Sequence, residues 1–368
     1  MRRKKPTSFL SASFLPTTAV LEMTYRCNHT CIFCSCPWFA PEKKYPVAEE
    51  ISSRKWREII DDLCGQGVTH VAFTGGEPLL KEGIEDIIVH AATRAYRCIE
   101  SKNGGWKKTA TRPRLYLLSN GLALNGDVLK LCRRFNVQLS LSLPGLATFQ
   151  AHTNVDNALG VLDLFRKARE MKIRTTVGIT VTRWNLSELY ETIAAAFIAG
   201  ADSLLMNRFL PGGRGLDWSR ELFLDGSEMK IMMDTAEEVL KRSDRAGSMG
   251  TEIPKCMVDA DRYSHLRIAT RCSAARDFFV IDPSGYVRVC NHSPERLSHA
   301  DEIGQLRCHP YWNIFATKDY LPDSCGRCRL MKTCDGGCRE AAHIIGHEVN
   351  AEDPLFLRLD RKTAEIRT

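Results

Sequence analysis

Short apolar runs alternate with amphipathic stretches between Ala19 and about Leu210. The apolar runs predict six strands, namely Ala19–Met23, His70–Phe73, Leu115–Leu118, Val137–Leu141, Arg174–Thr180 and Ser203–Met206. The stretches between them have a helical period of apolar positions. They predict one helix that begins at Ser52 or Ser53 and ends at Gly65, and others over Ile84–Ala95, Gly126–Phe135, Asn157–Met171 and Ser187–Ala199.

This alternation predicts an α/β fold with a parallel sheet, because consecutive parallel strands need a crossover helix. A full eight-unit barrel takes about 250 residues. About 190 are available here, so we expect a partial (β/α)6, TIM-like barrel. Residues 98–113 are polar and glycine-rich and predict an inserted loop. Leu216–Ser248 has apolar residues at helical spacing and predicts a helical connector.

The composition of the chain predicts its cellular compartment and argues against nucleic acid as a binding partner. The 368 residues are 44% hydrophobic and 26% charged, which is ordinary for a soluble enzyme. No apolar run approaches the ~18 residues of a membrane span, and Ser11, Ser13 and Pro16 interrupt any signal peptide, so we expect a cytoplasmic protein. The net charge of +7 comes without an aromatic-interleaved basic stripe, so nucleic acid is not expected. In such a compartment, fifteen cysteines indicate metal or cluster ligation rather than disulfides.

Three of these cysteines stand close together after the first predicted strand. The string MTYRCNHTCIFCSCPW places Cys27, Cys31 and Cys34 in the spacing Cys-x3-Cys-x2-Cys. Three thiolates from one loop suit three irons of a cubane 4Fe–4S cluster and leave the fourth iron open to a small molecule. A structural zinc site takes four ligands, commonly in two Cys-x2-Cys pairs, so this spacing does not favour zinc.

These residues resemble the signature of the radical S-adenosylmethionine (SAM) superfamily, in which an aromatic residue, here Phe33, precedes the last cysteine. The resemblance implies an enzyme whose open iron binds SAM and whose electron breaks SAM to give a 5′-deoxyadenosyl radical. It also implies a partial barrel with SAM at the carboxyl ends of the strands, and a flavodoxin- or ferredoxin-type electron donor. The cofactor then carries the hard chemistry and the protein positions it.

Further polar motifs follow the predicted strands. After the second strand, FTGGEPLL offers Gly75 and Gly76 for close backbone approach, and Glu77 as a carboxylate for an ammonium group. The resemblance implies that this motif binds the methionine amine of SAM. It likewise places Ser119, Asn120 and Ser142 near the SAM ribose and carboxylate, and Arg208 in MNRFLPGGRG near the carboxylate. Turn, cap or surface roles are the alternatives for these four residues.

A second cysteine-rich region lies near the C-terminus. Cys272-x12-Gly285-x4-Cys290 precedes Cys325-x2-Cys328-x5-Cys334-x3-Cys338, and together they resemble the SPASM extension of radical SAM maturases. The resemblance implies two auxiliary clusters. The first takes Cys272, Cys290, Cys338 and Cys256, and the second takes Cys325, Cys328 and Cys334. The other cysteines outside the first loop, Cys36, Cys64, Cys98 and Cys132, are expected to be bystanders, whereas Cys308 is considered below.

The chain departs from the SPASM pattern at one point. No cysteine follows Cys338, so the second cluster lacks an obvious fourth ligand. The open candidates are Cys308, Asp335, His343, His347 and water. One alternative is that this second cluster is absent. The other is that the whole cysteine-rich tail is a pair of structural zinc ribbons.

We therefore predict a radical SAM/SPASM enzyme that oxidatively modifies a peptide or protein, with CDGGCREAA loosely similar to the pyrroloquinoline-quinone peptide cyclase branch. About 18 residues precede the first strand, which is short for a fused leader-binding domain, so a separate leader-binding protein or direct capture by the barrel rim is expected. The alternatives are an enzyme acting on a small molecule, such as a tetrapyrrole carboxylate or an alcohol, and a zinc-stabilised binding module without catalysis.

The expected organisation has five parts. They are an N-terminal extension over 1–18, a radical SAM core over 19–215, a helical connector over 216–254, an auxiliary iron–sulfur domain over 255–345 and a C-terminal tail over 346–368.

Overall fold

The computed structural model describes residues 14–36, 49–102 and 105–356. Most of the expected N-terminal extension and the end of the expected tail lie outside these residues. The strands are β1 Thr18–Glu22, β2 His70–Thr74, β3 Tyr96–Lys102, β4 Gly105–Thr111, β5 Arg114–Ser119, β6 Gln138–Ser142, β7 Thr175–Val181, β8 Ser203–Arg208, β9 Gly247–Met249, β10 Leu266–Arg267, β11 Phe278–Ile281 and β12 Val287–Arg288. The α-helices are α1 Ser53–Gly65, α2 Ile84–Thr93, α3 Gly126–Phe135, α4 Phe149–Thr153, α5 Ala158–Glu170, α6 Leu189–Ala199, α7 Ser219–Leu222, α8 Gly226–Ser243, α9 Pro310–Thr317 and α10 Arg339–Gly346.

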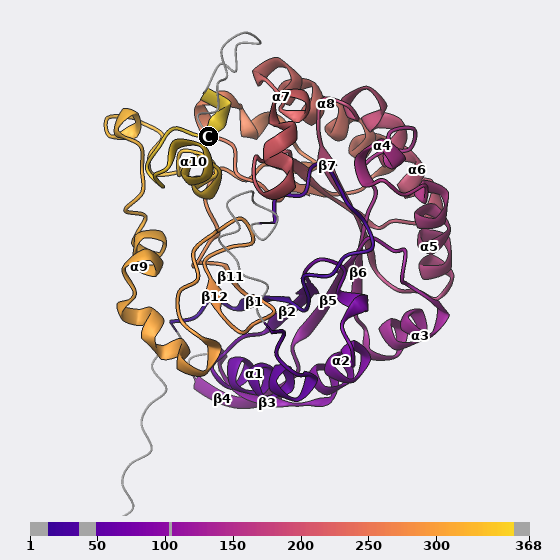
Figure 1. Cartoon of the computed structure of the whole chain (residues 1–368), viewed down its shortest axis with the longest axis vertical. Coiled ribbons are helices and arrows are strands. Elements are labelled where there is room, and N and C mark those ends of the chain that lie inside the picture. The colour runs from indigo at the N-terminus through magenta and orange to yellow at the C-terminus, as the bar shows by residue number, and fades with distance from the viewer. Residues whose placement is uncertain (1–13, 37–48, 103–104, 357–368) are drawn as a thin grey trace, which may run out of the picture.

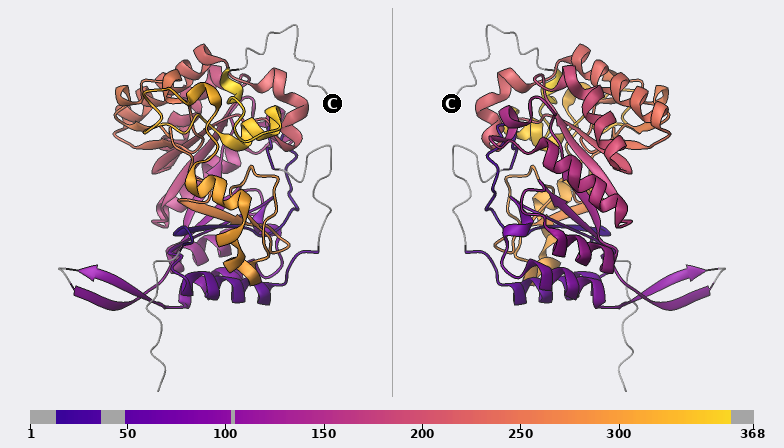
Figure 2. Two further views of the ribbon diagram at one scale, coloured as in Figure 1. Left: turned by 90° about the vertical axis from the view of Figure 1, so that its left-hand side faces the viewer. Right: turned by 90° about the vertical axis from the view of Figure 1, so that its right-hand side faces the viewer.

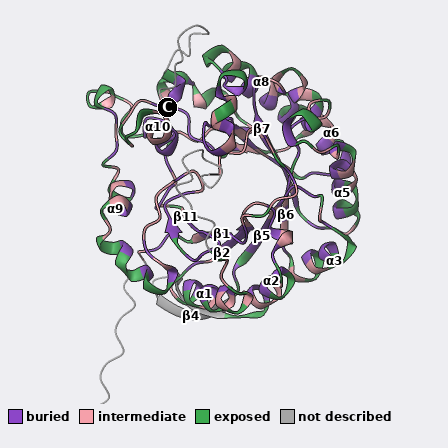
Figure 3. Cartoon of the chain, viewed as in Figure 1, coloured by how far each residue is buried: buried purple, intermediate pink, exposed green. Residues whose placement is uncertain are grey.

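The central sheet confirms the predicted partial barrel. Its order is β10-β9-β8-β7-β6-β5-β2-β1-β11-β12, and every neighbouring pair is parallel except β11 with β12. The six predicted strands are β1, β2, β5, β6, β7 and β8. Helices cover the outer side of the curved sheet (Figure 1). The parts of these helices that are coloured as buried lie on the side toward the sheet (Figure 3).

The helices begin and end where local sequence chemistry places them. The Ser52 hydroxyl accepts a hydrogen bond from the N–H of Lys55 and caps α1, whose buried stripe includes Trp56 and Ile60. A capping box of Asp225 and Glu228 begins α8. The connector helix α8 packs against α6, and β9 behind it joins β8, so this segment extends the barrel as well as linking two regions.

The loop expected over 98–113 is instead mostly a β-hairpin, and that prediction was wrong. Strands β3 and β4 pair from Tyr96 opposite Thr111 to Lys102 opposite Gly105, apart from the main sheet. The hairpin projects from the body beside α1 (Figure 2). Such a ribbon satisfies backbone hydrogen bonds by its own pairing, so apolar patterning gave no signal for it.

The C-terminal cysteine-rich region is built onto the edge of the barrel. Residues Thr18 to Leu21 of β1 pair with Phe278 to Ile281 of β11, so this region continues the sheet. Its orange and yellow segments fill the side of the molecule between the two sheet edges (Figure 1). No helix in the described ranges has the length and apolar character needed to cross a membrane.

Candidate functional site

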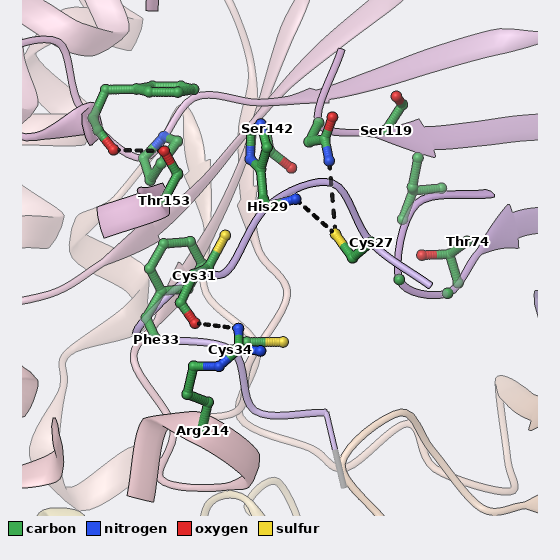
Figure 4. Close-up of a pocket in the computed structure, with 16 residues that line it drawn as sticks. Cys27, His29, Cys31, Phe33, Cys34, Thr74, Ser119, Ser142, Thr153 and Arg214 are labelled. Carbon is green, nitrogen blue, oxygen red and sulfur yellow. Dashed lines mark hydrogen bonds between the residues drawn. The ribbon is translucent and has the colours of Figure 1, made fainter. Parts of the chain in front are cut away.

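A cavity of about 220 Å³ opens at the carboxyl ends of β1, β2, β5 and β6. Its walls are Cys27, His29, Cys31, Phe33, Cys34, Thr74, Gly75, Gly76, Leu118, Ser119, Asn120, Ser142, Pro144, Phe149, Thr153 and Arg214 (Figure 4). This is the end of a barrel sheet at which active sites form. The structure therefore brings together the three cysteines, Phe33, both glycines, Ser119, Asn120 and Ser142, as the sequence predicted.

Backbone hydrogen bonds hold the cysteine loop from two sides. Beyond β2, the N–H groups of Gly76 and Glu77 donate to the carbonyls of Thr24 and Arg26, both at 2.8 Å. Near α4, the N–H groups of Thr30 and Ile32 donate to the carbonyls of Thr153 and His152, at 3.1 and 2.9 Å. The loop is thus fixed at both ends, which presents its thiols to the cavity in one arrangement.

Gly75 and Gly76 are required by the approach of two backbones. Gly75 has φ of +136°, and a Cβ there would lie 2.6 Å from the carbonyl oxygen of Thr24. A Cβ on Gly76 would lie 2.2 Å from the carbonyl oxygen of Arg26. The sequence predicted these glycines for ligand approach. The structure shows that they also let the cysteine loop lie directly against β2.

Glu77 is buried and is not among the residues that line the cavity. Its buried carboxylate accepts hydrogen bonds from the Ser119 hydroxyl at 2.9 Å, the N–H of Asn120 at 2.9 Å and the N–H of Leu79 at 3.2 Å. Burial raises its pKa, against the lowering effect of these donors. Both oxygens accept hydrogen bonds from the protein, so Glu77 fixes the loops after β2 and β5 relative to each other.

The polar groups of the cavity converge on the first cysteine. The Asn120 side-chain amide donates to the side-chain oxygen Oδ1 of Asn28 at 2.7 Å, and its nitrogen lies 3.8 Å from the Cys27 sulfur. The N–H of His29 lies 3.5 Å from the same sulfur (Figure 4). Hydrogen-bond donors around a sulfur favour its thiolate form, which is the form that binds metal.

The three thiols respond differently to this environment. Burial raises the pKa of Cys27 and of Cys31. A hydrogen bond from the Cys36 thiol lowers the pKa of Cys34 and raises that of Cys36. The sequence expected Cys36 to be a bystander, whereas it contacts Cys34. Thiolates that repel one another in a half-buried loop need a cationic group to balance them, so this donor set fits an iron–sulfur cluster.

Arg214 lines the cavity, whereas Arg208, which was expected from the sequence to lie near the SAM carboxylate, does not. Arg214 donates to the Cys31 carbonyl at 3.2 Å, and its charge lowers the pKa of both Cys31 and Cys34. Arg208 is instead buried in an ion pair with Asp353 at 2.6 Å, outside the cavity lining. Both arginines belong to the string MNRFLPGGRG. The glycines on either side of Arg214 could have indicated its position in the sequence. Gly213 has φ of +50° and lies against the carbonyl of Cys36, which brings this segment next to the cysteine loop.

The C-terminal cysteines form two sets. Cys272, Cys290 and Cys338 are buried, and the negative charges of Cys290 and Cys338 contribute, after burial, to raising the pKa of Cys272. Cys325 and Cys328 are half-buried, and the N–H of Cys328 donates to the carbonyl of Cys325 at 3.0 Å. Cys256 was expected in the first set, but it lies near Cys334. Its neighbour Lys255 donates its N–H to the Cys334 sulfur at 3.2 Å, which places it beside the second set.

Gly285 of the SPASM-like spacing has a steric reason to be glycine. It lies in the turn between β11 and β12 with φ of +89°, and a Cβ there would lie 2.4 Å from Nε2 of His299. This turn sets the direction in which the chain runs toward Cys290.

In the three ranges that the structure describes, no group of three His, Cys, Asp or Glu side chains is placed to hold a single metal ion. A zinc ribbon requires four such ligands around one ion. A cubane cluster takes one thiolate at each iron, so its ligands stand further apart than those of one ion.

Comparison with known proteins agrees with this geometry. The model of the radical SAM superfamily matches residues 21–196. PqqA peptide cyclase of Rhodopseudomonas palustris is 25% identical over 364 residues, which cover 92% of this chain and 86% of the relative. The sporulation killing factor maturation protein SkfB of Bacillus subtilis is 24% identical over 292 residues, covering 78% of this chain and 63% of SkfB.

Solved structures show the same fold over nearly the whole chain. Streptococcus suis SuiB bound to the precursor peptide SuiA has a TM-score of 0.68 at 13% identity, covering 92% of this chain and 75% of SuiB. The anSMEcpe protein with bound AdoMet has a TM-score of 0.67 at 15% identity, covering 92% of this chain and 90% of that protein.

Proposed function

We propose that this enzyme, which carries a radical SAM domain over residues 21–196, is a maturase that oxidatively modifies a peptide. One observation carries the proposal: Cys27, Cys31 and Cys34 line a single cavity together with the loops after β2, β5 and β6. The similarity to PqqA peptide cyclase extends over most of both chains, which supports a peptide as the substrate class.

The cavity residues have distinct roles in this proposal. Cys27, Cys31 and Cys34 would hold a 4Fe–4S cluster with one iron open to SAM. When bound, the cluster and SAM supply a 5′-deoxyadenosyl radical that abstracts a hydrogen atom from the substrate. The backbone around Gly75 and Gly76 would hold the methionine part of SAM, and the polar groups of Ser119, Asn120 and Ser142 would bind its ribose and carboxylate.

The remaining residues of the cavity wall exclude water and offset part of the thiolate charge. Phe33, Pro144 and Phe149 form an apolar side of the cavity and exclude water from the reacting atoms. Phe33 is held by the His152 ring, with the two centroids 5.7 Å apart. The Arg214 guanidinium offsets part of the thiolate charge, as its effect on Cys31 and Cys34 indicates.

SAM cleavage is the first test. The protein, purified and reconstituted without oxygen, should form 5′-deoxyadenosine from SAM and dithionite. Cys27→Ala should abolish this product, while Leu159→Ala, which changes an exposed residue of α5, should leave it unchanged. Persistence of 5′-deoxyadenosine in the Cys27 variant would refute the cluster assignment.

Substrate class needs a second test. Co-expression with short peptides encoded beside the gene, followed by mass spectrometry, should reveal a peptide whose mass has fallen by a multiple of two hydrogens. The modification should disappear with Cys27→Ala. A small molecule consumed in place of any peptide would overturn the peptide assignment while leaving SAM cleavage intact. Dependence on an added leader-binding protein or a flavodoxin-type donor can be measured in the same assay.

A further inference from the structure

The second C-terminal cysteine set has three members in the SPASM-like motif, and a fourth thiol stands beside it. Cys256 lies in the 3-10 turn Lys255–Met257, far from the motif in sequence. The N–H of Lys255 donates to the Cys334 sulfur at 3.2 Å, so this turn lies directly on Cys334. The thiols of Cys334, Cys325 and Cys328 all lie close enough to Cys256 for their charges to act on it.

The environment of this set is that of metal-binding thiolates. The Cys334 sulfur accepts a second N–H, from Gly336 at 3.4 Å, and the Cys328 sulfur accepts the N–H of Leu330 at 3.4 Å. Hydrogen bonds to the sulfurs tune iron–sulfur clusters and orient their ligands.

The other candidate ligands are occupied or lie elsewhere. The buried Asp335 carboxylate accepts from the Cys272 N–H at 2.8 Å and pairs with Lys318 at 2.6 Å and Arg276 at 3.3 Å. The Nδ1 atom of His343 contacts the Tyr311 hydroxyl at 3.0 Å and the Glu340 carboxylate at 3.1 Å, and both partners lie beside Cys290 of the buried set. Cys308 ends the 3-10 helix Ala300–Cys308, and His347 follows the end of α10.

The buried set has a carboxylate beside it in place of a fourth cysteine. Glu252 is buried and accepts the N–H of Ser273, next to Cys272, at 3.2 Å. The Glu252 carboxylate lies close enough to Cys272, Cys290 and Cys338, the three thiols of that set, for its charge to act on each of them.

We propose that Cys256 is the fourth ligand of the second auxiliary cluster and stands in for the cysteine that the chain lacks after Cys338. That cluster is then closed by four thiolates, Cys256, Cys325, Cys328 and Cys334. The buried cluster would then be the incomplete one, with the Glu252 carboxylate beside its three thiols. The inference rests on the proposed function, because the family supplies the two auxiliary clusters.

This exchange changes what each cluster is suited to do. A cluster with four thiolates has no free iron and is suited to electron transfer. A cluster with three thiolates and a nearby carboxylate has a position that an oxygen ligand or a substrate group can occupy. The proposal thus assigns electron entry or exit to the more exposed cluster and places the open iron in the interior.

Set deletions provide the test. One background removes the buried set (Cys272→Ala, Cys290→Ala, Cys338→Ala), and the other removes the motif part of the second set (Cys325→Ala, Cys328→Ala, Cys334→Ala). Cys256→Ala is added to each, and iron, sulfide and the electron paramagnetic resonance spectrum are measured after anaerobic reconstitution. We expect Cys256→Ala to remove or alter the remaining auxiliary signal in the first background and to change nothing in the second. The reverse pattern, or no effect in either background, overturns the proposal.

Single variants keep the test decisive if a background fails to fold. In the otherwise native chain, Cys256→Ser should alter the same signal as Cys325→Ser, and Cys272→Ser should alter the other. Cys308→Ser tests the rival ligand and should change neither. Formation of 5′-deoxyadenosine is followed in parallel, so loss of the SAM-binding cluster is distinguished from failure of this assignment. A Cys256→Ser spectrum that matches Cys272→Ser would contradict the proposal.

Discussion

The Ser119 hydroxyl donates a 2.9 Å hydrogen bond to the Glu77 carboxylate, and both groups are buried beside the cavity. The bond joins the loop after β2 to the end of β5. The same carboxylate also holds the N–H of Asn120, whose side chain reaches toward Cys27. The buried Glu77 carboxylate therefore sets the positions of Ser119 and Asn120, whose polar groups we expect to contact SAM.

Glu77→Gln should weaken SAM binding without removing the cluster. The amide keeps the shape but turns one acceptor into a donor, which leaves an N–H or the Ser119 hydroxyl without its partner. A loss of about 1–2 kcal/mol in positioning corresponds to roughly a tenfold rise in the dissociation constant of SAM. Equilibrium binding and iron content test this, with the exposed Glu82→Gln as control. Loss of iron in parallel with SAM affinity would contradict the positioning role.

Arg214→Gln should lower the reduction potential of the cluster at Cys27, Cys31 and Cys34. Its positive charge stabilises the thiolates, and it should equally stabilise the reduced, more negative cluster. We expect a shift of about 60 mV to more negative values, which is tenfold in a one-electron equilibrium. Arg214→Lys keeps the charge and should retain most of the potential. A redox titration followed by electron paramagnetic resonance measures both variants, and equal shifts would exclude the charge effect.

Arg208→Met should destabilise the fold rather than the cavity. The Arg208–Asp353 pair is fully buried, and Asp353 also accepts the N–H of Cys338 at 2.7 Å. Removing one partner leaves a buried charge, at a cost of about 3–5 kcal/mol in the free energy of unfolding. Arg208→Met combined with Asp353→Leu should recover part of this loss. Urea unfolding at equal cluster content measures it, and the exposed Arg54→Met should cost almost nothing. Additive losses in the double variant would refute the pairing.

Glu237→Gln should remove a pH-dependent part of the stability. Burial raises the pKa of Glu237, but hydrogen bonds from the N–H groups of Ser264 and Leu266 and from the Ser264 hydroxyl outweigh it and lower the pKa to about 2. Because the folded pKa is depressed, the stabilisation is complete above the unfolded pKa of about 4.5 and is lost as the pH falls toward 2.

We therefore expect Glu237→Gln to lower the free energy of unfolding by about 1.5–3 kcal/mol at pH 7, and the difference from the native chain to shrink below about pH 4.5. Urea unfolding of the cluster-free protein at a series of pH values tests this. The neighbouring Glu238→Gln, which changes an exposed helix pair, is the matched control. A difference that stays constant down to pH 3 would mean that the carboxylate charge is not the cause.

The sequence by itself determined the six core strands, the partial barrel with its parallel sheet, and the clustering of three cysteines in the first loop. Alternating strand and helix periods leave few ways to bury their apolar faces, and Cys27, Cys31 and Cys34 stand within one short loop, so their proximity follows from chain connectivity. Ser119 and Asn120 stand at the carboxyl end of a strand of the parallel sheet, so the topology also places them at the edge where the cysteine loop lies.

Only the tertiary structure decided which of several equivalent residues faces which site. Arg208 and Arg214 share one string, but the turn at Gly213 directs only Arg214 into the cavity. The carboxylate of Glu77 binds the loop after β5, and Cys256 lies beside Cys334, 78 residues further along the chain. Contacts between distant segments depend on the path of the backbone and on how side chains pack, and residue type and spacing carry no record of either.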